Sequence, residues 1–134
     1  MRSARVKAYR RGVFAETLAA LLFRLKGYRI VARRYRTPVG EIDLVALRGK
    51  RLVFVEVKRR KTAEDAAWTL PAKQRRRIVR AAQYWLASHP DVTGHDIAFD
   101  VVLTAPWTWP RHCASSRSAK VESPRISMRS MGSI

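Results

Sequence analysis

The fold is decided by residues 40–59, which read GEIDLVALRGKRLVFVEVKR. Two runs of apolar, often β-branched residues flank an Arg-Gly-Lys tripeptide, and this pattern predicts a β-hairpin. A loop of Gly49 and Lys50, with glycine first, matches a favoured type II′ turn. In that register Leu44 lies opposite Val55, and a slip of one residue would turn every side chain to the other face.

The same register gathers charged side chains on one face of the hairpin. Asp43 lies opposite Glu56, and Glu41 lies opposite Lys58. Opposed carboxylates, roughly 5 Å apart at Cβ, repel unless one takes up a proton or a cation binds between them. A hard divalent cation accepts carboxylate ligands and keeps positions for water and phosphate. The hairpin therefore suits metal-dependent phosphodiester hydrolysis, with Lys58 steadying the attacking water or the developing charge.

The hairpin also fits a surface that binds no metal. An exposed face of a hairpin often carries charged residues, and Lys58 can pair with Glu41 directly and with Asp43 diagonally. An arginine of this basic chain can neutralise Glu56. Spacing alone leaves both interpretations open.

The hairpin resembles a known nuclease motif. Gly-Glu-Ile-Asp-Leu-Val and, after the turn, Val-Phe-Val-Glu-Val-Lys look like the PD-(D/E)XK motif. More narrowly, the chain resembles the YraN-type family of small bacterial endonuclease-like proteins, which is related in fold to archaeal Holliday-junction resolvases. The resemblance covers residues 10–112. Its weaker pieces are Gly12-x-x-Ala15-Glu16, Gly27-Tyr28-Arg29-Ile30, Lys73-x-x-Arg76 and Phe99-Asp100-Val101.

The resemblance implies a site and a reaction. It implies that Asp43 and Glu56 bind Mg²⁺ or Mn²⁺ and that Lys58 is catalytic. We expect the backbone carbonyl of Val57 as a further ligand, and Glu41 and Glu16 as auxiliary residues. The expected reaction is hydrolysis of phosphodiester bonds in DNA, with structured or branched DNA as the substrate.

The composition indicates a polyanionic partner. The chain has 134 residues, which suits one domain, and a formal net charge of +18. Nucleic acid is the simplest partner, and its binding should weaken steeply as salt rises. The alternative is an arginine-rich surface that only keeps the protein soluble. The single cysteine, Cys113, and the lack of an apolar run of ~18 residues favour a cytoplasmic protein without membrane contact.

Four further segments complete the expected fold. Apolar spacing predicts helices over residues 11–26 and 69–88, the second capped by Thr69, and strands over residues 28–36 and 96–104. The last strand follows a crossover helix, so we expect it to run parallel to its neighbour. The predicted order is α-β-β-β-α-β, an α/β fold with a mixed sheet flanked by helices. The resemblance implies a restriction-endonuclease-like core.

The first helix has an apolar stripe that we expect to be buried. Glu16 lies nearly opposite this stripe on a helical wheel, either in solvent or, if the helix crosses the sheet, near the metal. The stripe consists of Phe14, Leu18, Leu21, Leu22 and Leu25.

The two ends of the chain look different from the middle. Residues 1–10 are expected to form a mobile basic arm, and residues 11–112 the nuclease-like domain. Residues 113–134 are rich in serine and arginine and poor in large apolar groups, so we expect them to be disordered.

Basic residues lie beside the predicted site in two groups. One follows the hairpin directly and would hold phosphates that flank the cut. The other recurs at three- and four-residue steps on the second helix, where it either faces a phosphate backbone or forms a solvated face. The residues are Arg59, Arg60 and Lys61 in the first group, and Lys73, Arg76, Arg77 and Arg80 in the second. Lys73 is expected nearest the metal.

Other functions and roles stay open at this point. The chain also suits a nucleic-acid-binding protein that does no chemistry, or a basic accessory protein of the ribosome that prefers RNA. Asp100 is either a third acid of the site or a hydrogen-bonded structural residue. Cutting branched DNA would favour a symmetric homodimer.

Overall fold

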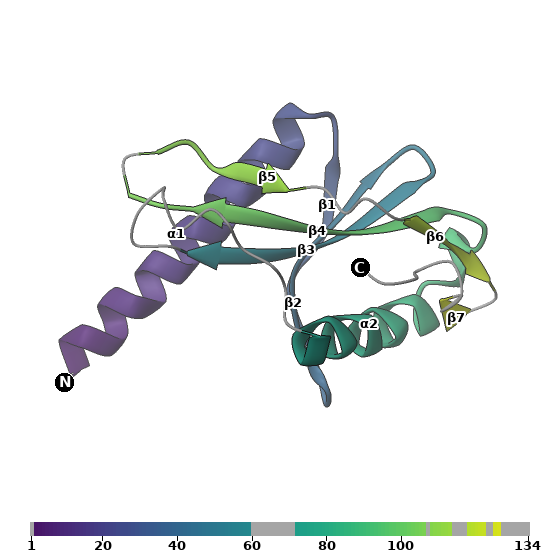
Figure 1. Cartoon of the computed structure of the whole chain (residues 1–134), viewed down its shortest axis with the longest axis horizontal. Coiled ribbons are helices and arrows are strands. Elements are labelled where there is room, and N and C mark those ends of the chain that lie inside the picture. Colours follow the sequence, from purple (N-terminus) through teal and green to yellow (C-terminus); the bar gives the residue numbers. More distant parts are fainter. Residues whose placement is uncertain (1, 60–71, 107, 114–117, 123–124, 127–134) are drawn as a thin grey trace.

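The computed structural model describes residues 2–59, 72–106, 108–113, 118–122 and 125–126 (Figure 1). The expected order α-β-β-β-α-β is present, and short strands follow it. The elements are α1 (Arg2–Leu25), β1 (Arg29–Thr37), β2 (Gly40–Arg48), β3 (Arg51–Arg59), α2 (Ala72–Ala87), the 3₁₀ turn η2 (Pro90–Val92), β4 (Asp96–Thr104), β5 (Arg111–Cys113), β6 (Ser118–Glu122) and β7 (Arg125–Ile126).

The centre of the fold is a mixed sheet in the order β1-β2-β3-β4. The pairs β1–β2 and β2–β3 are antiparallel, whereas β3 and β4 are parallel, as the crossover through α2 requires. Alternate residues of β3 enter different cores: Leu52 and Phe54 pack with α2, and Val53 and Val55 pack with α1. The helices therefore cover opposite faces of the sheet, and the expected α/β class with a restriction-endonuclease-like core is confirmed.

The predicted register of the hairpin is confirmed over most of its length. Leu44 pairs with Val55, and the ladder continues to the pair Arg48 and Arg51. Gly49 has a φ of 59°, a left-handed conformation that suits the first position of the predicted turn. The ladder ends at the pair Leu44 and Val55, so the predicted pairs of Asp43 with Glu56 and of Glu41 with Lys58 are not part of it.

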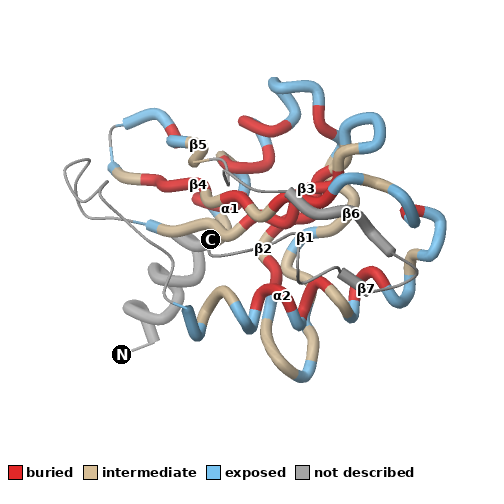
Figure 2. Tube along the Cα trace, turned by 45° about the vertical axis from the view of Figure 1, so that its right-hand side comes forward, coloured by how far each residue is buried: buried red, intermediate tan, exposed pale blue. Residues whose placement is uncertain are grey.

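The second helix buries one side against the sheet, and in Figure 2 buried segments alternate with more exposed ones along α2. Ile78, Ala81, Ala82 and Trp85 are all buried, and the Trp85 ring meets Phe54 edge-on at a centroid distance of 5.8 Å. The expected cap at Thr69 lies outside the described residues. Among the described helices, α1 included, none has the length and apolarity that crossing a bilayer would need.

The prediction for the buried face of α1 is wrong. Phe14, Leu21 and Leu25 are 65%, 45% and 67% exposed, whereas Leu22 is buried. The face against the sheet instead carries small residues together with one large ring, namely Ala15, Ala19, Ala20 and Phe23. Alanines let the helix approach the sheet closely, and Phe23 fills the remaining space. Apolar residues occur on both faces of this helix, so their spacing does not identify the inner one.

The helix also begins earlier than the sequence predicts. It starts at Arg2, so most of the segment expected to form a mobile arm is helical. The physical reason is that residues 2–11 contain neither glycine nor proline, so nothing interrupts a helix that the packed half has nucleated.

Part of the segment that the composition predicts to be disordered forms short strands. β5 pairs with the end of β4 at Val101–Leu103, and β6 pairs with its start at Asp96–Ala98 (Figure 1). Pairing at a sheet edge needs backbone N–H and C=O groups rather than large apolar side chains, so the composition of the tail did not reveal it. Residues 114–117 and 127–134 lie outside the described residues.

Candidate metal centre

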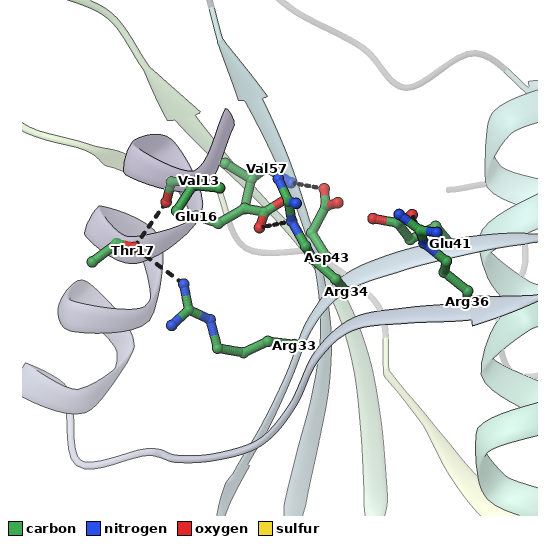
Figure 3. Close-up of polar contacts among 9 residues, drawn as sticks. All are labelled: Val13, Glu16, Thr17, Arg33, Arg34, Arg36, Glu41, Asp43 and Val57. Atoms are coloured by element: carbon green, nitrogen blue, oxygen red, sulfur yellow. Dashed lines mark hydrogen bonds and ion pairs between the residues drawn. The ribbon is translucent and has the colours of Figure 1, made fainter. Parts of the chain in front are cut away.

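The candidate site lies where the β2–β3 ladder ends. The N–H of Val57 donates a hydrogen bond of 2.7 Å to Oδ2 of Asp43 (Figure 3). A buried N–H needs an acceptor, and here a side chain supplies it where the ladder no longer does. Asp43 is thereby held between the two strands rather than on one outer face of the sheet.

Two further carboxylates join Asp43 there. Glu16 comes from α1 and is only 8% exposed, and Glu41 comes from β2 and is exposed. One oxygen of each of the three side chains lies within 4.8 Å of the others. Oxygens that share one Mg²⁺, at metal distances of about 2.0 to 2.1 Å, lie at most about 4.2 Å apart, so these three need at most a small further approach to share one ion. The group therefore fits a hard divalent cation.

The position of Asp43 makes its negative charge costly. Burial raises the pKa of its carboxyl from 3.8 to about 7, and the negative charge of Glu56 contributes next. The hydrogen bond from Val57 acts in the opposite direction, and the charges of Glu16 and Glu41 raise the pKa further. Carboxyls whose pKa is raised by burial and by neighbouring charges are frequent at functional sites.

Glu56 and Lys58 form a second group next to the first. The Nζ atom of Lys58 lies 3.0 Å from Oε1 of Glu56, and the side-chain amide of Gln74 donates to the same oxygen at 3.2 Å. The sequence predicts that Asp43 and Glu56 share one cation. The group of three carboxylates does not include Glu56, so its metal ligation stays a prediction, as does that of the Val57 carbonyl.

Glu41 does not form the cross-strand pair with Lys58 that the register predicts. It lies opposite Arg36 of β1, and Nε of Arg36 is 3.4 Å from Oε2 of Glu41 (Figure 3). The ladder between β2 and β3 stops before it reaches Glu41, so the neighbour on the other strand becomes its partner. The pair is well exposed and contributes at most about 1 kcal/mol.

Arg34 is a residue of the site that sequence reasoning missed. Its Nε atom donates to Oε2 of Glu16 at 2.5 Å, and both side chains are largely buried (Figure 3). Among the described non-glycine residues, Arg34 is the one with a positive φ, 50°. The register of β1 on β2 places it between the pairs Arg33–Leu44 and Tyr35–Ile42, level with Asp43. The register of β1 on β2 could have indicated that Arg34 lies beside Asp43, but the sequence does not specify how this edge strand aligns with β2.

The basic residues of the prediction are only partly described. Arg59 is exposed at the end of β3, and Arg60 and Lys61 lie outside the described residues. Lys73, Arg76, Arg77 and Arg80 all lie on α2 and are exposed. Two of these four residues, Lys73 and Arg77, line a hollow between α2 and the start of β2, and the other two do not.

Asp100 lies apart from the three carboxylates, on the face of the sheet that α1 covers. It is buried, and its Oδ2 atom lies 2.7 Å from Nε2 of His112 on β5. The other ring nitrogen of His112 lies 2.6 Å from Nζ of Lys26. These contacts link β4, β5 and the end of α1, and they fit the interpretation of Asp100 as a hydrogen-bonded structural residue.

Comparison with known proteins places the chain in a family. Residues 15–104 match the model described as "Uncharacterised protein family UPF0102". A UPF0102 protein of Parvibaculum lavamentivorans is 55% identical over 109 residues, which are 81% of this chain and 82% of that protein. One from Rhodopseudomonas palustris (strain BisB18) is 51% identical over 115 residues, which are 86% and 85% of the two chains. One from Bradyrhizobium diazoefficiens is 49% identical, with 86% of each chain covered. The chain therefore belongs to the UPF0102 family, the YraN-type family whose motifs its sequence resembles.

Proposed function

We propose that this protein is a metal-dependent nuclease that hydrolyses phosphodiester bonds in DNA. The observation that carries the proposal is the convergence of Glu16, Glu41 and Asp43 within 4.8 Å of one another, next to Lys58 and Glu56. In a chain with a net charge of +18, and without a metal site, we would expect each of the few acidic side chains to lie beside basic side chains rather than beside other acids. Here three of ten gather at the end of one hairpin.

The residues of the site have separable roles in this proposal. Asp43, Glu16 and Glu41 would hold Mg²⁺ or Mn²⁺, and Glu56 would contribute from β3. When bound, the cation offsets negative charge on the phosphate and makes a bound water more acidic. Lys58 would stabilise the charge that develops on the phosphate or orient the attacking water. Its contact with Glu56 keeps the ammonium near the site.

Branched or otherwise structured DNA is the substrate that we propose. The positive charge of the chain supports a nucleic-acid partner, and the kinship of the motif with junction-cutting nucleases favours branched forms. The test is incubation of the purified protein with duplex, single-stranded, flap and four-way DNA and with RNA, in Mg²⁺, Mn²⁺ or EDTA. Products that need a metal and arise from branched DNA support the proposal. Equal products in EDTA, or none with any substrate, overturn it.

One observation favours a second candidate, a nucleic-acid-binding protein without catalysis. The guanidinium of Arg34 already contacts Glu16, so part of the negative charge is balanced within the protein. In that case the carboxylates would need no metal. Titration with Mn²⁺ in a calorimeter separates the candidates, because the nuclease binds the ion and a binder of this kind gives no heat of binding.

The affinity for Mn²⁺ is expected to depend on pH through Asp43. A proton competes with the metal for this carboxyl, whose pKa is raised to about 7. As the pH rises toward 7, the dissociation constant for Mn²⁺ should therefore fall about tenfold per pH unit, and above pH 7 it should level off. Calorimetry between about pH 5.5 and about pH 8 measures this directly. An affinity that does not change over this range would exclude Asp43 as a ligand.

A further inference from the structure

We propose that the hollow between the start of β2 and α2 is a subsite for one backbone phosphate of the nucleic acid, held by Lys73 and Arg77. This inference rests on the proposed function, since it places the substrate next to the candidate metal centre. The hollow has a volume of about 320 Å³. It is lined by Gly40, Glu41, Glu56, Lys73, Gln74, Arg77 and Ile78.

The hollow adjoins the carboxylates of the candidate centre. Glu41 belongs to the group of three carboxylates and also lines the hollow. Glu56, which contacts Lys58, lies on the same lining. A strand with one phosphate at the carboxylates would therefore run directly into the hollow, where it meets the basic wall formed by α2.

The basic wall lacks an internal counter-charge. Lys73 and Arg77 lie one turn apart on α2, where like charges repel each other. Within the described part of the chain, neither side chain forms an ion pair or a hydrogen bond. The two acids that line the same hollow have other partners: Glu56 contacts Lys58 and Gln74, and Glu41 contacts Arg36. An anionic group between the two cations would relieve their repulsion, and a phosphodiester is the anion that nucleic acid supplies.

The start of β2 passes close to Arg77. A Cβ atom added at residue 40 would lie at ordinary contact distance from Arg77, 3.7 Å from its carbonyl oxygen and 3.8 Å from its Cβ. Arg77 therefore leaves α2 where the helix passes the start of β2, and it lines the hollow together with Glu41.

The four cations of α2 supply a matched comparison. Lys73 and Arg77 line the hollow, whereas Arg76 and Arg80, which are also one turn apart and exposed, do not. The double variants Lys73→Gln/Arg77→Gln and Arg76→Gln/Arg80→Gln each lose two positive charges from the same helix. Glutamine is a good helix former, so both variants should fold. Thermal melts of both variants check this.

The experiment measures binding of labelled four-way and single-stranded DNA in EDTA by anisotropy at several salt concentrations. The hollow variant should bind at least about tenfold more weakly than the control variant, because only it loses a phosphate contact of defined geometry. Its slope of log affinity against log salt should be shallower than that of the control variant by about 0.7 to 0.9, the value for one phosphate. Equal losses in the two variants would overturn the subsite.

The outcome is separable from that of the proposed function. Binding in EDTA requires no metal and no cleavage, so the subsite stands if the hollow variant alone loses affinity, even when the protein cuts nothing. Conversely, if the protein cuts DNA and both variants bind alike, the nuclease stands and the subsite is wrong. In an active protein the hollow variant should also raise KM while its calorimetric affinity for Mn²⁺ stays unchanged.

Discussion

Replacing Asp43 with asparagine is expected to abolish binding of Mn²⁺ and to lower kcat/KM for DNA cleavage by about 10³-fold or more. Asparagine keeps an oxygen that can accept the hydrogen bond from Val57, so the local backbone should persist. It removes the charge that a divalent cation needs, and the contribution of such a cation is several kcal/mol. Calorimetry with Mn²⁺ and initial cleavage rates measure the two effects.

The stability of the Asp43→Asn variant makes the result interpretable. In the folded protein Asp43 stays protonated up to about pH 7, whereas an unfolded aspartate loses its proton near 3.8. The stability associated with the raised pKa is therefore present below pH 3.8 and is lost as pH rises through 7. Without metal, the variant should melt at or above the temperature of the original protein at pH 8. The control is Asp91→Asn, the same change at an exposed site. Retained cleavage by Asp43→Asn would contradict the proposal.

Replacing Lys58 with methionine is expected to lower cleavage by 10²- to 10⁴-fold, roughly, and to leave binding of Mn²⁺ intact. Methionine has a similar length and no charge, so it removes the ammonium and little of the packing. Glu56 keeps its hydrogen bond from Gln74, which limits the disturbance of the site. Cleavage rates and calorimetry on the same preparation separate this effect from loss of the metal.

The control for Lys58 lies in the same hairpin. Lys50 is exposed in the turn, at the other end of the ladder. Lys50→Met should cut DNA at nearly the original rate, since it loses the same charge far from the carboxylates. Wild-type rates in the Lys58 variant would remove the lysine from the chemistry. Equal losses in both variants would assign the effect to general attraction of the polyanion.

Local pattern was enough to predict the parts of the fold that local interactions specify. A glycine-containing turn between two apolar runs determines how Leu44 meets Val55, because the turn sets the register and a slip of one residue would turn every side chain to the other face. The buried stripe of α2 follows in the same way from one apolar side and one basic side. The parallel pairing of β4 with β3 follows because a helix between two strands of one sheet carries the chain back across the sheet before the next strand begins.

Tertiary packing decided what the pattern could not. Phe14 and Leu25 look like core residues along α1, yet the alanines face the sheet because close approach favours small side chains. This orientation of α1 turns the Glu16 side chain inward toward Asp43. The helical wheel of the isolated helix was equally compatible with a Glu16 side chain in solvent. Arg34 was missed for the same reason, since its contact with Glu16 joins two segments whose alignment no local rule specifies.

The left-handed backbone of Arg34 has a consequence for how this protein responds to selection. An arginine at a φ of 50° costs on the order of 1 kcal/mol relative to residues that tolerate this conformation. Glycine or asparagine would relieve that cost but would leave Glu16 without the guanidinium. Removing one partner of a largely buried ion pair costs about 3 to 5 kcal/mol, which exceeds the relief of the backbone. The ion pair with Glu16 therefore keeps an arginine at this left-handed position. Laboratory evolution for heat tolerance should retain Arg34 rather than exchange it for glycine.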